Sequence, residues 1–132
     1  LIEKLDLKKE VILLKRQPRI NILYMMKQSD IICSQFKHSW LSYGVVFEAL
    51  AMSKIVMTYR NDNLYKKKYK TLYPIINING PQKINQCLSK YIKNKKKYVE
   101  MGKEGEKWYM KYCVKQTLKK YISYFNDIKK NK

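Results

Sequence analysis

Acidic residues are scarce in this sequence: 10 Asp and Glu stand against 29 Lys and Arg among 132 residues, a formal net charge of +19. Such an excess of positive charge attracts polyanions such as nucleic acids, acidic lipid headgroups and phosphorylated ligands. The cations are nearly all lysine and accompany many Asn, Ile and Tyr residues, which A/T-rich codons encode. We therefore treat the charge as a weak guide to function, because a biased genome gives most of its proteins this composition.

Histidine and cysteine are also rare, which argues against a metal site and a disulfide framework. The single His38 has no surrounding pattern of histidines or cysteines, whereas zinc sites need several such ligands. The cysteines are odd in number, widely spaced and set among apolar residues, as expected of small core residues in a reducing compartment. They are Cys33, Cys87 and Cys113. We expect no metal ion and no cofactor.

Long apolar runs are missing as well. No run reaches the ~18 residues of a membrane-spanning helix, and the start of the sequence has no signal-peptide pattern. The chain is 45% hydrophobic, enough to bury a core, and its length predicts a single domain, residues 1–132. Without a span or a signal peptide, the expected location is the cytoplasm. The first residue is Leu1 rather than methionine, which leaves open a start inside a longer chain.

Short apolar runs alternate with helical patterns along the chain. Strands are predicted at Val11–Leu14, Ile31–Cys33, Ile55–Thr58 and Pro74–Ile78. Helices are predicted at Leu1–Leu7 (a helix end), Arg19–Gln28, Gly44 to about Met52, Pro81–Ile92, Tyr98–Trp108 and residues 113–132. This alternation predicts an α/β fold, a parallel sheet of about four strands flanked by helices, with a helical C-terminus.

Some predicted helices also indicate which side chains they bury. In Arg19–Gln28, the residues Ile20, Leu23 and Tyr24 share a face. The next-to-last helix contains Gly102 and Gly105, and each weakens a helix by about 1 kcal/mol relative to alanine. The last helix is amphipathic. Its apolar positions are Val114, Leu118, Tyr121, Ile122 and Phe125.

The least charged stretch, Tyr43–Tyr59, contains one acid, Glu48. Burying a carboxylate costs several kcal/mol unless it is paired, so Glu48 either has an internal partner or binds a ligand. Ligands of parallel sheets bind beyond the carboxyl ends of the strands, where the helix that Gly44 opens would begin. The free amides of Gly44, Val45 and Val46, together with the helix dipole, would bind an anion there.

A diphosphate on this helix end and a sugar diol on Glu48 would describe a nucleotide-type ligand. Two plainer interpretations stay open at this point. Gly44 could begin a helix without any ligand, and Glu48 could be an exposed polar residue of an amphipathic helix.

The segments SDIICSQF and YGVVFEALAMSKIVMTY resemble the signature of group 1, family-4-like retaining glycosyltransferases, which have the GT-B architecture of two Rossmann-like domains. The similar segments follow the family's order from Leu5 to Phe125. They include Asp30–Ile32 (the aspartate-led strand), Tyr43-Gly44 (the phosphate-binding turn), Glu48–Met52 (the EAMA helix), Ile55-Val56, Leu72–Asn77 and Tyr98–Trp108. The resemblance implies the C-terminal, nucleotide-sugar-binding domain, an incomplete half of a GT-B fold.

The resemblance also implies an activity and a set of donor contacts. Such enzymes transfer a sugar from a nucleotide-sugar donor to an acceptor hydroxyl, usually without a metal, often in polysaccharide or glycolipid synthesis. It places the donor ribose on Glu48 and the diphosphate on the amides of Gly44, Val45 and Val46. Further candidates for the base or phosphate are Tyr43, Lys15 and Arg16.

The sequence departs from the family at Trp40, where relatives carry their first signature glutamate. The family's N-terminal acceptor domain with its catalytic loop is not in the sequence. We therefore leave the catalytic residues unassigned and expect an incomplete fragment that is inactive alone. The expected partners are the donor, an acceptor glycan or lipid-linked glycan, a missing N-terminal domain or chain, and the inner face of a membrane by peripheral contact.

Two alternatives belong to other functional classes. The first is a basic, non-enzymatic module that binds nucleic acid or an anionic membrane surface through Lys66–Lys68 and Lys93–Lys97. Such lysine runs are more often solvated surface, so we do not expect nucleic acid to be the partner. The second is a gene remnant that folds but binds nothing.

Overall fold

The computed structural model describes residues 2–3, 8–41, 43–67, 70–80 and 82–130. Most of the predicted Leu1–Leu7 helix end, together with Pro81 and Lys68, lies outside the described residues. The strands are β1 (Ile31–Cys33), β2 (Ile55–Thr58) and β3 (Ile76–Asn77). The helices are α1 (Arg19–Gln28), α2 (Gly44–Ala51), α3 (Asp62–Lys66), α4 (Gln82–Lys93), α5 (Lys95–Tyr109) and α6 (Gln116–Lys130), with a π-helical stretch η1 (Met110–Lys115) between the last two.

The three strands form one parallel sheet in the order β1-β2-β3, which confirms the predicted α/β class. All four residues of the central strand β2 are buried, as the continuous apolar run Ile55–Thr58 predicts. Alternate β2 side chains point to opposite faces of the sheet. Val56 joins one cluster with α1 and α2, while Ile55 and Met57 join a second cluster with α4. The sheet is therefore covered on both faces.

Helix α5 contributes to both clusters, because its first half carries Tyr98 and Met101 and its end carries Trp108 and Tyr109. Its two glycines, Gly102 and Gly105, are buried where α5 meets α2 and the turn that follows α2. A β-carbon on Gly102 would lie 2.2 Å from the Ser53 carbonyl oxygen, and one on Gly105 would lie 2.6 Å from the Leu50 side chain. These glycines thus permit close packing of α5 on α2, a benefit that their helix propensity does not reveal.

The predicted first strand is wrong. Val11–Leu14 forms no strand, and Ile12, Leu13 and Leu14 are exposed, Leu13 to 77%. A strand of this kind needs a hydrogen-bonding neighbour and cover on both faces, and no described element supplies them. The sheet therefore has three strands rather than about four.

The buried face of α1 also differs from its prediction, although its bounds agree. Ile20 and Tyr24 are 72% and 63% exposed, while Met26 is buried and Ile22 and Leu23 pack beside it. The apolar contacts of this helix with the body are therefore made by Ile22, Leu23 and Met26. The predicted fourth strand is shorter than expected, because only Ile76 and Asn77 pair with β2.

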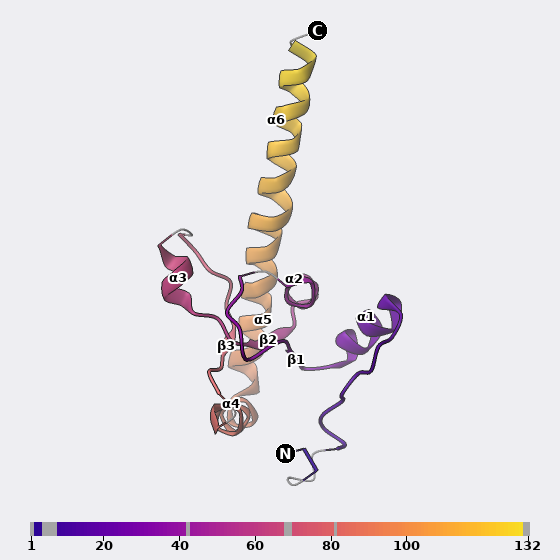
Figure 1. Cartoon of the computed structure of the whole chain (residues 1–132), viewed down its shortest axis with the longest axis vertical. Coiled ribbons are helices and arrows are strands. Elements are labelled where there is room, and N and C mark those ends of the chain that lie inside the picture. The colour runs from indigo at the N-terminus through magenta and orange to yellow at the C-terminus, as the bar shows by residue number, and fades with distance from the viewer. Residues whose placement is uncertain (1, 4–7, 42, 68–69, 81, 131–132) are drawn as a thin grey trace.

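The last helix extends away from the rest of the protein. In Figure 1, α5 runs past the sheet and α6 continues from it beyond all other elements to the C-terminus. Every residue of α6 is exposed, so the predicted amphipathic pattern is present but its apolar face is uncovered. The sheet, α2, α4 and α5 form the packed body that positions the candidate site.

Candidate functional site

The candidate site begins at the N-terminus of α2, just beyond the carboxyl end of β1. Tyr43 has extended backbone geometry and provides no side-chain cap. Its carbonyl oxygen accepts hydrogen bonds from the amides of Val46 (3.0 Å) and Phe47 (3.1 Å). Among the described residues, no hydrogen bond uses the amide of Gly44 or Val45. Of the three amides predicted to be free, two are, whereas that of Val46 is buried and already has an acceptor.

Gly44 is exposed, and a β-carbon placed on it would meet nothing within 4 Å. No positive φ requires glycine at this position, in contrast to Gly80 (φ +99°). Neither internal packing nor backbone conformation therefore explains the glycine. The open space leaves the helix end accessible to a ligand that must approach the backbone closely.

Glu48 lies one turn along α2 from Gly44 and is only partly buried. Its Oε1 is 2.7 Å from an Nη of Arg19, the first residue of α1. The carboxyl side chain is 26% exposed and the arginine side chain 76% exposed. The pair brings a cation to the acid at the edge of the candidate site. A pair in which one partner is this exposed contributes only about 0.2–1 kcal/mol, so it can open at little cost.

An aromatic pair flanks the same helix end. The rings of Trp40 and Tyr43 are stacked, with centroids 5.2 Å apart and planes 4° apart. Trp40 is 61% exposed, whereas Tyr43 is half-buried. An exposed indole face beside free amides can stack on a planar ring of a ligand. The position that departs from the family pattern thus presents a flat apolar surface.

Lys15 and Arg16, the predicted contacts to the base or phosphate, are not partners of Glu48. Lys15 and Arg16 are exposed, and neither has an ion pair within the described part of the chain. Arg19 is the cation beside Glu48 instead, a residue that sequence reasoning did not select. The sequence identified Arg19 only as the first residue of the predicted helix Arg19–Gln28. The pairing itself depends on how α1 packs against α2.

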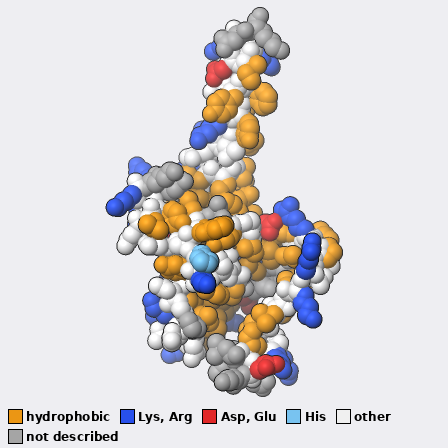
Figure 2. Space-filling view, in the orientation of Figure 1, with side chains coloured by type: hydrophobic (Ala, Val, Ile, Leu, Met, Phe, Trp, Pro, Cys, Tyr) orange, Lys and Arg blue, Asp and Glu red, His pale blue; other side chains and the backbone are white. Residues whose placement is uncertain are grey.

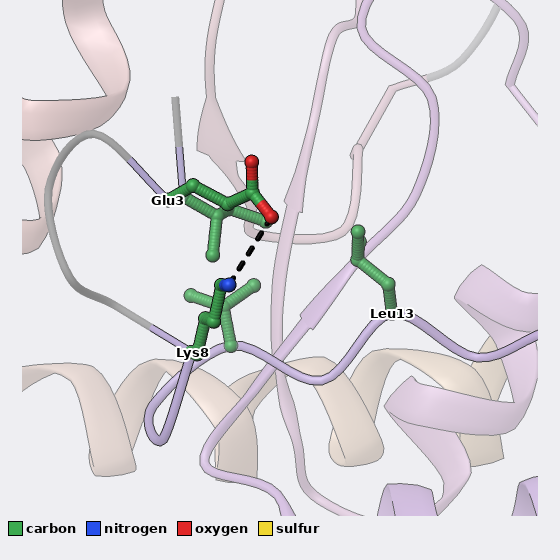
Figure 3. Close-up of a pocket in the computed structure, with 5 residues that line it drawn as sticks. Glu3, Lys8 and Leu13 are labelled. Atoms are coloured by element: carbon green, nitrogen blue, oxygen red, sulfur yellow. Dashed lines mark ion pairs between the residues drawn. The ribbon is translucent and has the colours of Figure 1, made fainter.

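Two hollows of the surface lie elsewhere. One, of about 440 Å³, lies at the N-terminal segment, where Lys8 pairs with Glu3 at 3.2 Å. Figure 3 shows this pair with Leu13 nearby. A second, of about 560 Å³, opens between α3 and the segment before β3, near Arg60 and Tyr73. Glu48 and Gly44 line neither of them. The candidate site is therefore separate from both of these hollows.

Arg60, beside the second hollow, has a structural arrangement. It is 3% exposed, and its Nε donates to Asp62 at 2.6 Å. An Nη donates to the Tyr73 carbonyl oxygen at 3.0 Å, and the guanidinium lies 4.4 Å from the centre of the Tyr73 ring. Its backbone also exchanges two hydrogen bonds with the Asn77 side chain. These contacts occupy the guanidinium, so Arg60 serves the fold.

Metal ligands, cysteines and membrane-spanning helices were the other features considered from the sequence. Within the described residues there is no group of three or more His, Cys, Asp or Glu side chains that could hold a metal ion. All three cysteines are unpaired, and Cys33 is exposed, which corrects the expectation that each is a core residue. The described helices include none that is long and apolar enough to cross a membrane.

Comparisons with protein-family models, with curated proteins and with solved structures find no match to this chain.

Proposed function

We propose that this chain binds the nucleotide-sugar donor of a retaining glycosyltransferase and forms the Rossmann-like donor half of a GT-B enzyme. The proposal assigns it the donor side only. The acceptor, a glycan or lipid-linked glycan, and the catalytic groups belong to the other half of such an enzyme. Nucleotide sugars are cytoplasmic substrates in this scheme, so we propose a cytoplasmic location.

One observation carries the proposal: an unobstructed glycine at a helix N-terminus lies one turn from a carboxylate on the same helix. Gly44 offers free space, the amides of Gly44 and Val45 have no acceptor among the described residues, and Glu48 follows on the same face. Helix N-termini bind phosphate groups through such amides and the helix dipole. The parallel sheet and the order of its elements support the same placement.

The chemistry of the donor matches these groups. The diphosphate would accept hydrogen bonds from the amides of Gly44 and Val45. The ribose hydroxyls would donate to the Glu48 carboxylate, which can accept several hydrogen bonds when ionised. On binding, the Arg19 guanidinium would turn from Glu48 toward the diphosphate, because a doubly charged anion attracts it more strongly than one carboxylate. The stacked Trp40 and Tyr43 rings would lie at the side of the ligand.

The decisive experiment is thermal unfolding with saturating uridine, guanosine or adenosine diphosphate. A ligand at 100 times its Kd should stabilise the protein by about 2.7 kcal/mol, a shift of several degrees in Tm. Glu48→Ala should abolish the shift, whereas Glu104→Ala, which changes an exposed acid of α5, should retain it. Equal Tm values with and without every nucleotide would contradict the proposal.

A second candidate rests on exposed lysines. Lys66, Lys67 and Lys95–Lys97 are all exposed, as a basic module for nucleic acid would require. Such binding would weaken steeply with salt, because each phosphate contact releases counterions. It would also be unaffected by Glu48→Ala. Salt-dependent retention on a polyanion column, compared between the wild type and this variant, distinguishes the two candidates.

A further inference from the structure

The donor proposal leaves the uncovered apolar face of α6 unexplained. Leu118, Tyr121, Ile122, Phe125 and Ile128 are each between 54% and 63% exposed. They recur at three- and four-residue spacing, so they form one continuous stripe along the helix. Figure 2 shows hydrophobic side chains along this projecting helix. Large exposed apolar patches mark interaction surfaces in monomeric proteins.

The segment before α6 is held against the body, whereas every residue of α6 itself is exposed. Trp108 and Tyr109, at the end of α5, pack on the core cluster. Thr71 anchors the next turn, because its carbonyl oxygen accepts from Trp108 Nε1 (3.2 Å) and its hydroxyl hydrogen-bonds Tyr112 (3.0 Å). The π-helical stretch η1 follows and rotates the direction of the side chains before α6 begins. The stripe is thus held at a distance from the sheet.

Positive charge borders the stripe. Lys115 and Lys129 lie along one edge, while Lys119, Lys120 and Lys130 lie on the polar face together with the single acid of the helix, Asp127. Long lysine side chains at such borders can cover apolar surface while their ammonium groups reach outward. Any partner must therefore offer an apolar layer with negative charge beside it.

A second copy of the helix does not meet this requirement. The positions Val114, Leu118, Tyr121, Phe125 and Ile128 alternate by four and three residues, as in a coiled coil. However, the flanking positions contain lysines and no acid that could pair with them across a dimer. A pair of such helices would therefore gain no ion pair along its flanks. Nucleic acid would satisfy the lysines but offers no apolar layer to a stripe of this length.

We propose that α6 lies in the interface of an anionic lipid bilayer, with its apolar stripe in the acyl boundary and its lysines at the headgroups. The aromatic residues Tyr121, Tyr124 and Phe125 suit this depth, since amphipathic rings favour the membrane–water interface. Lysines bordering the stripe attract acidic headgroups. The helix is too polar to span the membrane, so it would bind the surface. The inference uses no residue of the donor site.

The test is flotation of the whole chain with lipid vesicles. Vesicles of equal parts phosphatidylglycerol and phosphatidylcholine should carry the protein upward, and vesicles of phosphatidylcholine alone should carry at least ten-fold less. The double variant L118S/F125S should reduce binding to the anionic vesicles at least ten-fold. The variant N126S/S123N, which changes only the polar face, should bind like the wild type. Unchanged Tm values would show that these variants fold, as expected for side chains outside the core.

Three results would overturn the proposal: no flotation with anionic vesicles, equal flotation of wild type and L118S/F125S, or a concentration-dependent dimer in sedimentation that L118S/F125S abolishes. Glu48→Ala should leave flotation unchanged. Failure of the membrane proposal is therefore distinguishable from failure of the donor proposal, because the nucleotide-induced shift in Tm does not depend on α6.

Discussion

A β-carbon on Gly102 of α5 would lie 2.2 Å from the carbonyl oxygen of Ser53, in the turn between α2 and β2. No real β-carbon approaches a backbone oxygen so closely, so Gly102→Ala must displace α5 or the turn. We expect this variant to be less stable by about 1–3 kcal/mol, as for overpacked cores. Urea unfolding followed by circular dichroism measures the difference.

Helix propensity alone predicts the opposite sign, because alanine in a helix interior is about 1 kcal/mol more favourable than glycine. The exposed residue Glu104 on the same helix is the control, and Glu104→Ala should change stability little. A Gly102→Ala protein more stable than the wild type would show that α5 does not pack on this turn.

These glycines illustrate what the sequence can and cannot predict here. Local spacing and composition predict where most elements lie: α1, β1 and β2 have the predicted bounds. They do not predict which neighbour an element meets. Val11–Leu14 has the composition of a buried strand, yet Ile12, Leu13 and Leu14 are exposed because no described element covers them.

In the candidate site too, the sequence predicts some features and not others. The positions of Gly44 and Glu48 on one helix follow from their spacing, and the structure places them so. The Arg19 partner could not be predicted, because the ion pair joins two helices whose packing depends on the whole chain. The occupied amide of Val46 was missed for a smaller reason: the Tyr43 carbonyl closes the first turn of α2 onto it.

Gly44→Ala should separate ligand binding from stability. The new methyl group would meet no protein atom within 4 Å, and alanine is the better helix former, so the Tm should stay equal or rise slightly. The methyl would instead occupy space that a diphosphate needs against the backbone. We expect the nucleotide-induced shift in Tm to fall or vanish. A full shift in Tm for this variant would show that the diphosphate does not bind at the N-terminus of α2.

Asp62→Asn should destabilise the protein, because it leaves the Arg60 guanidinium buried without its counter-charge. Asp62 accepts from Arg60 Nε at 2.6 Å, and Arg60 is 3% exposed. A hydrogen bond to a charged group contributes about 1.5–3 kcal/mol, and we expect a loss of about 2 kcal/mol in urea unfolding. In an Arg60→Met background the same substitution should cost much less. Equal losses in both backgrounds would mean that the pair is not coupled.

Tyr73 should make the protein less stable at high pH. Burial raises the pKa of its phenol, and this outweighs the lowering effect of Arg60 beside it. In the unfolded chain a tyrosine has a pKa of about 10. Between that value and the higher pKa of the folded state, unfolding releases the proton. The free energy of unfolding therefore falls as the pH rises above about 10, and the contribution is complete below it.

Tyr73→Phe removes this contribution while keeping the ring against Phe47 and Trp108. It also removes the hydrogen bond from the phenol to the Leu41 carbonyl oxygen, so at neutral pH we expect a loss of about 1 kcal/mol. The difference between wild type and variant should then shrink from about pH 9 to pH 11 in urea unfolding. Tyr24→Phe, at an exposed tyrosine of α1, is the control and should leave the pH dependence unchanged. Parallel curves for wild type and Tyr73→Phe across this range would mean that the phenol titrates alike in the folded and unfolded chains, which its burial should prevent.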